Sequence, residues 1–330
     1  MSKVFTGVAP TNGGAARGKY LSVKTTWSVR AWRTTLTLAT VTFLVALGTL
    51  ARADSSAGKI VVSGDEWAFS DDGLPNNYTY VTNVLKWFGL TPNGSGKMVL
   101  ILDGQSWNSG YNGTSGAFGS DFRSLLTGTG VAVTYRGYQD DAVTLTGYDA
   151  VFVDGFMVKA STLPADLANF VGGGGAVYLA GGTGTLSPAN ATGEASYWQP
   201  FFTAATGSSD FGLVGGSSWF EENLPLQVAG PIGDGVTVLK WYMGQGVEVG
   251  SNPNASAAIW DSSHTLVATW SAPAHISISR QGSNVILSWP GSQVLQTSTN
   301  VVGTYVDMVS ATSPFTNGIA PTGSCFFRLR

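Results

Sequence analysis

The sequence predicts an α/β fold, a doubly wound and mainly parallel sheet with an antiparallel extension, followed by a small all-β sandwich. Short apolar strands alternate with helical patterns over about 150 residues, which indicates βαβ units and right-handed crossovers. From about Phe211 strands follow one another without helices, and a third group of closely spaced strands closes the chain. A length of 330 residues accommodates two domains.

The parallel part is predicted from five strands with helices between them. The strands are expected at Lys59–Ser63, Met98–Leu102, Val131–Tyr135, Ala150–Val153 and Ala176–Ala180. Residues 64–73 are expected to form a loop, and helices are expected over Tyr80–Phe88, Ser120–Gly128, Pro164–Val171 and Ala195–Ala205. Met98–Leu102 is a continuous apolar run, typical of a strand buried on both faces.

The remaining strands lack helices between them. Those of the antiparallel extension are expected at Leu226–Ala229, Val236–Trp241, Val247–Val249, Ala257–Trp260 and Leu266–Trp270. A linker, Ser271–Ala274, precedes the sandwich strands expected at Ile276–Ser279, Val285–Trp289, Val294–Thr297, Tyr305–Val309 and Phe326–Leu329. The predicted boundaries are 54–271 for the α/β domain and 272–330 for the sandwich.

The N-terminal segment has the pattern of a signal peptide. Residues 1–53 carry seven Lys and Arg and no acidic residue, and an apolar run, Leu36–Leu50, precedes Ala51-Arg52-Ala53. We expect cleavage after Ala53 and a secreted or envelope protein whose remaining 10 basic and 20 acidic residues give a charge of −10. The alternative is an uncleaved anchor, although the run is shorter than the roughly 20 residues of a spanning helix.

Composition excludes several kinds of site. One Cys cannot form an internal disulfide or a Cys-rich zinc site, and two His cannot supply a three-His centre. Beyond the N-terminal segment no basic tract suggests nucleic-acid binding, so we expect membrane contact through the export signal alone.

Three stretches carry a resemblance to a known superfamily. They are Asp65-Glu-Trp-Ala-Phe-Ser70, Tyr148-Asp-Ala-Val-Phe-Val-Asp-Gly155 and the glycine-rich Leu167–Gly184. Residues 58–270 resemble the class I glutamine-amidotransferase-like proteins, whose fold is flavodoxin-like, and more closely secreted bacterial proteins of unknown function built on that fold. Residues 285–290, 295–300 and 326–330 resemble a fibronectin-type-III-like tail, which implies an accessory module.

The chain departs from the amidotransferase pattern at the catalytic turn. In that family a Cys nucleophile follows a strand and is served by a His and a carboxylate, whereas here the turn after Ala180 is Gly181-Gly-Thr-Gly184. The only thiol, Cys325, lies in the predicted sandwich. Thiolate chemistry needs a base beside the sulfur, so the family's activity is not expected here.

Four acidic residues are predicted to meet at one edge of the sheet. Asp65 and Glu66 follow the first strand, Asp103 the second and Asp154 the fourth, and ligands bind at the carboxyl ends of such strands. The cluster could bind Ca²⁺ or Mg²⁺ through oxygen ligands, or two carboxyls could share acid–base work as in sugar hydrolysis. Alternatively, each residue caps a turn or helix on its own. No cofactor other than these ions is predicted.

Further residues complete the candidate set. Gly181, Gly182, Thr183 and Gly184 could cradle an anion, or could only form a tightly packed turn. Trp67, Trp107, Trp198 and Trp219 lie in or near predicted loops, where they could stack on sugar rings or a protein partner, and Trp219-Phe-Glu-Glu222 is most like a recognition patch. Trp87, Trp241, Trp260, Trp270 and Trp289 are expected in the core. Asp261-Ser-Ser-His264 is expected to be a hairpin turn rather than a catalytic triad.

Three functions remain open. The first is an exported, non-catalytic binding or surface protein that contacts an extracellular glycan or envelope component through the acidic rim and the loop Trp residues. The second is a carbohydrate-active or metal-assisted hydrolase that uses Asp65, Glu66, Asp103 and Asp154. The third is a structural component of the envelope.

Overall fold

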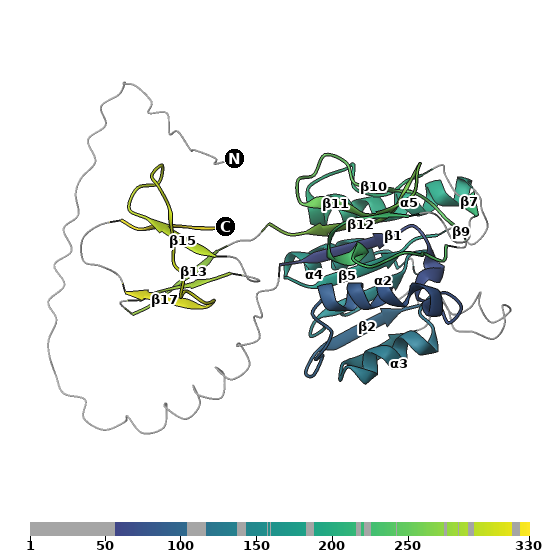
Figure 1. Ribbon diagram of the computed structural model, residues 1–330, viewed down its shortest axis with the longest axis horizontal. Coiled ribbons are helices and arrows are strands. Elements are labelled where there is room, and N and C mark those ends of the chain that lie inside the picture. The colour runs from purple at the N-terminus through teal and green to yellow at the C-terminus, as the bar shows by residue number, and fades with distance from the viewer. Residues whose placement is uncertain are drawn as a thin grey trace, which may run out of the picture. The chain divides into compact units, whose positions relative to one another are not determined.

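A mixed α/β part and a set of small antiparallel sheets make up the described structure, which is a computed structural model (Figure 1). It describes residues 57–103, 117–136, 143–156, 158, 160–182, 188–215, 219–220, 226–241, 243–273, 276–282, 284–289, 294–318 and 324–330. We call residues 57–273 the α/β part and residues 276–330 the C-terminal part. This confirms the coarse prediction of an α/β region with β-only structure after it.

An eight-stranded sheet forms the centre of the α/β part. Its order is β3 (Ala132–Arg136), β2 (Met98–Leu102), β4 (Ala150–Asp154), β5 (Ala176–Ala180), β1 (Lys59–Ser63), β12 (Thr265–Ser271), β11 (Ala255–Trp260) and β8 (Gln227–Val228). The first five strands are parallel to one another, and β12, β11 and β8 continue the sheet in antiparallel pairs. Three of the five strands predicted for the antiparallel extension, near Leu226–Ala229, Ala257–Trp260 and Leu266–Trp270, are therefore confirmed in this sheet, whereas the strand at Val247 lies in a separate two-stranded sheet.

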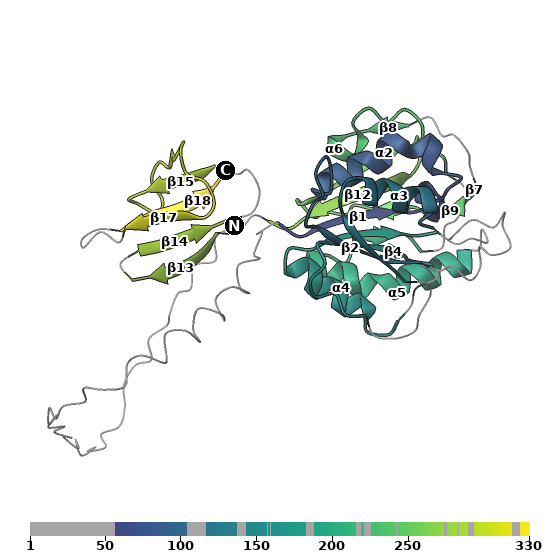
Figure 2. The same cartoon turned by 90° about the horizontal axis from the view of Figure 1, so that it is seen from below.

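Helices cover both faces of the sheet (Figure 2). Helices α2 (Leu74–Trp87) and α3 (Ser120–Gly128) pack on one face, and α4 (Leu163–Gly172) and α5 (Pro188–Thr206) pack on the other. Because successive strand residues point to opposite faces, Val61 belongs to the first core and Ile60 and Val62 belong to the second. A 3₁₀ helix, η1 (Glu66–Phe69), replaces part of the loop expected after β1.

Phe69 anchors η1 in the first core. Its ring lies 4.8 Å from that of Phe122 and 4.3 Å from that of Tyr178, measured between centroids. Such aromatic contacts add to the apolar area that the side chain buries. They fix the 3₁₀ turn that carries Glu66 at the carboxyl end of β1.

The strand expected at Val236–Trp241 is absent, and that prediction is wrong. The Asn77 side chain accepts a hydrogen bond from the Lys240 N–H at 2.6 Å and donates to the Lys240 carbonyl at 3.1 Å. A side chain thus satisfies backbone groups that a neighbouring strand would otherwise pair. Short elements flank this segment: β6 (Gly212–Leu213) pairs with β10 (Val247–Glu248), β7 (Trp219–Phe220) pairs with β9 (Met243–Gly244), and α6 spans Gly230–Gly233.

Two three-stranded antiparallel sheets form the C-terminal part. They are β13 (Ser277–Gln281), β14 (Asn284–Ser288) and β17 (Phe315–Gly318), and β16 (Val306–Asp307), β15 (Leu295–Ser298) and β18 (Phe326–Leu329). Their common core is small and centres on the buried side chains of Leu287, Trp289 and Leu295. The sequence did not predict β17, whose Thr-Asn-Gly run lacks the apolar alternation of a strand.

Candidate functional site

The carboxyl ends of the parallel strands bring the predicted acidic residues together. Ser63 at the end of β1 and Asp154 at the end of β4 both lie opposite Ala180 of β5, so the three strands end at one level. Within the described residues, five carboxyl side chains at this end are each 1% exposed or less, namely those of Asp65, Glu66, Asp103, Asp154 and Glu194. We call these five residues the acidic rim.

Asp65 and Asp103 hold backbone groups in place, as the capping alternative predicted. Asp65 Oδ1 accepts a hydrogen bond from the Trp67 N–H at 3.0 Å and caps η1. The Asp103 carboxyl accepts from the Ala117 N–H at 3.0 Å, the Phe118 N–H at 3.3 Å and the Tyr135 hydroxyl at 3.2 Å. These two carboxyls therefore have a structural role whatever else the rim does.

Glu194 on α5 is a member of the rim that the sequence did not reveal. Its carboxylate accepts hydrogen bonds from the Gly182 N–H at 3.2 and 3.4 Å. Gly182 has φ +147°, a conformation that favours glycine, and it directs its N–H toward α5. The glycine turn after β5 does hold an anion, but within the described residues that anion is the chain's own carboxylate.

Gly181 shows why the turn is tightly packed. Its N–H donates to the Ser63 carbonyl at 2.7 Å, which ties the turn to β1. A Cβ atom added to Gly181 would lie 2.6 Å from a Leu213 methyl group, closer than packed atoms approach. Thr183 and Gly184, the other two residues of the predicted cradle, lie outside the described residues.

The Glu66 carboxyl is the least satisfied group of the rim. Both of its oxygens are buried, and neither has a hydrogen-bond partner among the described residues. Burial raises the pKa of Glu66 well above its ordinary value, and the negative charges of Asp154, Glu194, Asp65 and Asp103 raise it further. Glu66 therefore holds its proton at pH values at which an exposed Glu has lost it.

Asp103 is shifted in the same direction. Burial is the main cause that raises the pKa of Asp103 to about 7, and the nearby charge of Asp154 is the second. The hydrogen bonds that Asp103 accepts act in the opposite direction and lower this pKa. Two carboxyls of the rim thus have unusual affinity for protons. A buried cluster of like charges at the carboxyl ends of parallel strands, where ligands bind, is typical of functional sites.

Gln245 is a second buried polar group without a partner among the described residues, and no sequence pattern pointed to it. It follows β9, is 0% exposed, and has neither its side-chain oxygen nor its nitrogen hydrogen-bonded among the described residues. Its backbone N–H donates a hydrogen bond at 2.9 Å to the carbonyl of Gly64, the residue directly before Asp65. A Cβ atom added to Gly181 would lie 3.3 Å from its Nε2. The Gln245 amide therefore lies between the two turns that carry Glu66 and Gly182.

The described part of the chain gives no geometric support to the Ca²⁺ or Mg²⁺ hypothesis. No group of three or more His, Cys, Asp or Glu side chains in it is arranged to hold a metal ion. Hard cations require several oxygen ligands that converge at about 2.0–2.6 Å.

Two of the four loop Trp residues, Trp67 and Trp198, are buried and so do not belong to an exposed recognition surface. Trp67 is 5% exposed and Trp198 is 0% exposed, and the Trp198 indole N–H donates to the Gly155 carbonyl at 2.7 Å. Both rings pack in the interior of the α/β part, since η1 and α5 turn them inward. Trp107 lies outside the described residues, as do the Trp219 side chain and Glu221-Glu222.

The core Trp residues follow the prediction in part. Trp241, Trp270 and Trp289 are 0 to 4% exposed. Trp87, at the end of α2, and Trp260, on β11, are only half-buried.

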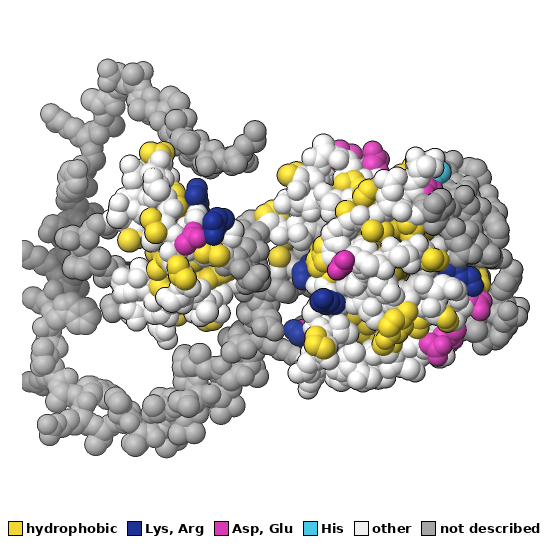
Figure 3. Space-filling model, in the orientation of Figure 1, with side chains coloured by type: hydrophobic (Ala, Val, Ile, Leu, Met, Phe, Trp, Pro, Cys, Tyr) yellow, Lys and Arg dark blue, Asp and Glu magenta, His cyan; other side chains and the backbone are white. Residues whose placement is uncertain are grey.

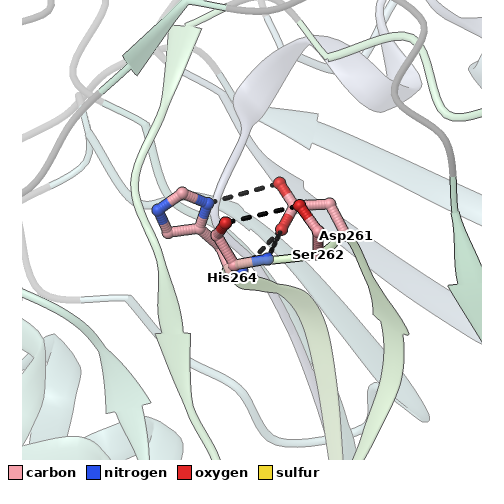
Figure 4. A network of polar contacts seen from close by, with 4 residues as sticks. Asp261, Ser262 and His264 are labelled. Atoms are coloured by element: carbon pink, nitrogen blue, oxygen red, sulfur yellow. Dashed lines mark hydrogen bonds and ion pairs between the residues drawn. The ribbon is translucent and has the colours of Figure 1, made fainter.

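Asp261 and His264 form the turn between β11 and β12 (Figure 4). The Asp261 carboxylate accepts hydrogen bonds from the Ser263 and His264 N–H groups and lies 3.2 Å from His264 Nδ1. Burial opposes ionisation of this carboxylate, but these hydrogen bonds hold the pKa of Asp261 below its ordinary value. The Ser262 hydroxyl lies 3.4 Å from that of Ser263. These contacts are those of a side-chain-capped turn.

The described surface carries few charges, and on the face seen in Figure 3 they lie as separate spots on mostly uncharged surface. No described helix is long and apolar enough to cross a membrane, and the apolar run at 36–50 lies outside the described residues.

No protein-family model, curated protein or solved structure gives a significant match to the chain.

Proposed function

We propose that this chain is an exported binding protein whose ligand site is the acidic rim, with Glu66 at its centre. The proposal rests on the observation that both oxygens of the Glu66 carboxyl are buried without a hydrogen-bond partner among the described residues. Buried polar groups are nearly always hydrogen-bonded, because leaving one unsatisfied costs about 1–3 kcal/mol. A ligand that supplies the missing partners explains the arrangement.

The fold supports this location. Strands β3, β2, β4 and β5 have the order of the first four strands of a flavodoxin-like sheet, and β1 takes the fifth place. In such sheets the crevice lies where the order reverses, here between β2 and β4, the strands that carry Asp103 and Asp154. Asp103 and Asp154 of the proposed site lie at this switch point, and Glu66 follows β1, which is the neighbour of β5.

The resemblance to amidotransferase-like proteins supports binding rather than their chemistry. The turn after β5 holds Gly181 and Gly182 in place of a nucleophile, and Cys325 is an exposed residue beside β18. The C-terminal part fits the accessory tail that we infer from its resemblance to fibronectin-like modules. The N-terminal pattern of residues 1–53 supports export.

A second candidate function is hydrolysis of a glycan, and the Glu66 carboxyl favours it. A general acid must keep its proton near neutral pH, and the raised pKa of Glu66 meets that requirement. A neighbouring carboxylate of Asp154 or Glu194 would then act as nucleophile or base.

Access to the rim requires local opening. All five carboxyls are 1% exposed or less, so a ligand reaches Glu66 only when covering atoms move. Amide hydrogen exchange at Gly182 and Gln245 measures that opening, and we expect a bound ligand to slow it.

The test compares E66Q with E248Q in the full exported chain. Glu248 on β10 is exposed, so E248Q makes the same chemical change outside the rim. The probes are calcium, magnesium, glucose, glucosamine and ethanolamine in a thermal-shift assay, and p-nitrophenyl glycosides in a hydrolysis assay. We expect at least one probe to raise the melting temperature of the unsubstituted chain and of E248Q but not of E66Q.

The two assays separate the two functions. Release of p-nitrophenol that is lost in E66Q and kept in E248Q would favour hydrolysis over binding alone. A probe that raises the melting temperature of E66Q as much as that of the unsubstituted chain binds outside the acidic rim. A panel that leaves the unsubstituted chain unmoved contradicts the proposal.

A further inference from the structure

The charges around Glu66 point to the class of ligand. The charges that raise the pKa of this carboxyl are those of Asp154, Glu194, Asp65 and Asp103, and they come from β4, α5 and the turns after β1 and β2. Carboxylates that are buried without a cation are costly, and an opposite charge placed among them removes much of that cost. The rim is therefore complementary to a positive charge.

The missing hydrogen-bond partners narrow this class further. The Glu66 carboxyl, once it has released its proton, and Gln245 Oε1 are acceptors without a hydrogen-bond partner among the described residues. A primary ammonium group carries three N–H donors and no acceptor, which matches this set. A metal ion fits less well, because no described group of three or more ligands is arranged to hold one.

Gln245 Nε2 adds a second requirement. It is a buried donor without a partner among the described residues, and it lies beside Gly181 at the edge of the rim. An ammonium group cannot satisfy it, because it offers no acceptor. A ligand that carries an oxygen atom close to its ammonium group can satisfy both the Glu66 carboxyl and the Gln245 amide.

We propose that the acidic rim binds a small primary ammonium compound with an oxygen acceptor on a neighbouring carbon, the chemistry of amino alcohols and amino sugars. The ammonium group lies against Glu66 and the neighbouring carboxylates, and the oxygen accepts from Gln245. This inference rests on the proposed function, and it adds the charge and the polar pattern of the ligand.

The experiment uses matched ligands and isothermal titration calorimetry on the full exported chain. Glucosamine is compared with N-acetylglucosamine, in which the amine is capped as an amide, and with glucose, in which a hydroxyl replaces it. Ethanolamine is compared with ethylamine, which lacks the oxygen. We expect glucosamine to bind at least tenfold more tightly than both neutral sugars, and ethanolamine at least tenfold more tightly than ethylamine.

Two variants and one control locate the site. E66Q removes the central carboxyl, and Q245L removes the amide while nearly keeping the side-chain volume, so either serves if the other fails to fold by circular dichroism. We expect each to weaken glucosamine binding at least tenfold. E248Q, on the exposed face of β10, should leave the affinity unchanged.

Each contrary outcome has its own meaning. If the neutral sugars bind as tightly as glucosamine and E66Q still abolishes binding, the ammonium inference is overturned and the proposed function stands. If glucosamine binds equally to E66Q and Q245L, the rim is not its site and the inference fails. If none of the five compounds binds, the inference is also overturned, and calcium and magnesium remain to test the proposed function.

Discussion

The two ends of strands β2 and β4 carry opposite arrangements of charge. At the amino end, Lys97 Nζ lies 3.1 Å from Asp149 Oδ1, and the other Asp149 oxygen accepts a hydrogen bond from the Met98 N–H at 2.7 Å. These side chains are 28% and 23% exposed. At the carboxyl end of the same strands, Asp103 and Asp154 are 0% exposed and repel each other.

The difference shows that strand geometry alone does not produce the acidic rim. Both ends belong to the same parallel pairs, yet the amino end joins opposite charges in partial contact with water. An ion pair of that kind is an ordinary structural contact of small net value. A buried group of like charges opposes folding, so its presence at one end calls for a role other than stability.

Loss of the aromatic support beneath the rim is the largest effect that we expect. F69A removes a fully buried ring that contacts Phe122 and Tyr178, and should lower the free energy of unfolding by about 3–5 kcal/mol. F88A is its counterpart at the amino end, where the ring is only half-buried, and should cost about half as much. Urea denaturation measures both. Equal losses would mean that the two ends are equally packed.

The pH dependence of stability is the second test. The pKa of Asp103 is about 7 in the folded protein and near 4 in the unfolded chain, so between these values the folded form holds a proton that the unfolded form has released. Stability should therefore fall as the pH rises from about 4 to about 7, by at most about 4 kcal/mol from this group. Glu66, whose pKa is also raised, adds to the fall.

The variant D103N identifies the source of this slope. It removes one titrating group, so we expect a flatter profile in urea denaturation from pH 4 to 7, and the double variant D103N/E66Q should be flatter still. D149N makes the same change at the amino end and should keep the slope. A profile that D103N leaves unaltered would show that Asp103 is ionised in the folded state.

Local sequence patterns were sufficient for the elements of the parallel sheet. Continuous apolar runs between glycine-rich turns gave β1, β2 and β5 at their observed bounds, because strands buried on both faces need apolar residues at every position. The same reasoning failed at Val236–Trp241. There the Asn77 side chain, 163 positions away from Lys240, binds its backbone, and no local pattern reports such a contact.

The candidate site was predictable only where its residues end strands. Asp65, Glu66, Asp103 and Asp154 follow from strand ends, and the structure brings them together. Glu194 comes from within α5, one residue before the predicted start of that helix, and Gln245 lies in a glycine-flanked loop. Their proximity depends on tertiary packing. Only its place after Gly193 and directly before the predicted helix start at Ala195 could have drawn attention to Glu194.

The smallest effect on stability that we expect comes from a substitution at the amino end of β2 and β4, and it tests the contrast between the two ends of these strands. K97M removes the partly exposed ion pair with Asp149 and should cost about 0.2–1 kcal/mol in 50 mM salt, measured by urea denaturation. In 1 M salt this cost should nearly vanish, because exposed charges are screened, whereas the effect of D103N on the pH slope should persist in a buried site. If K97M is as damaging as F69A and insensitive to salt, the amino end is also a buried electrostatic site. The contrast between the two strand ends then gives no support to a ligand role for the carboxyl end.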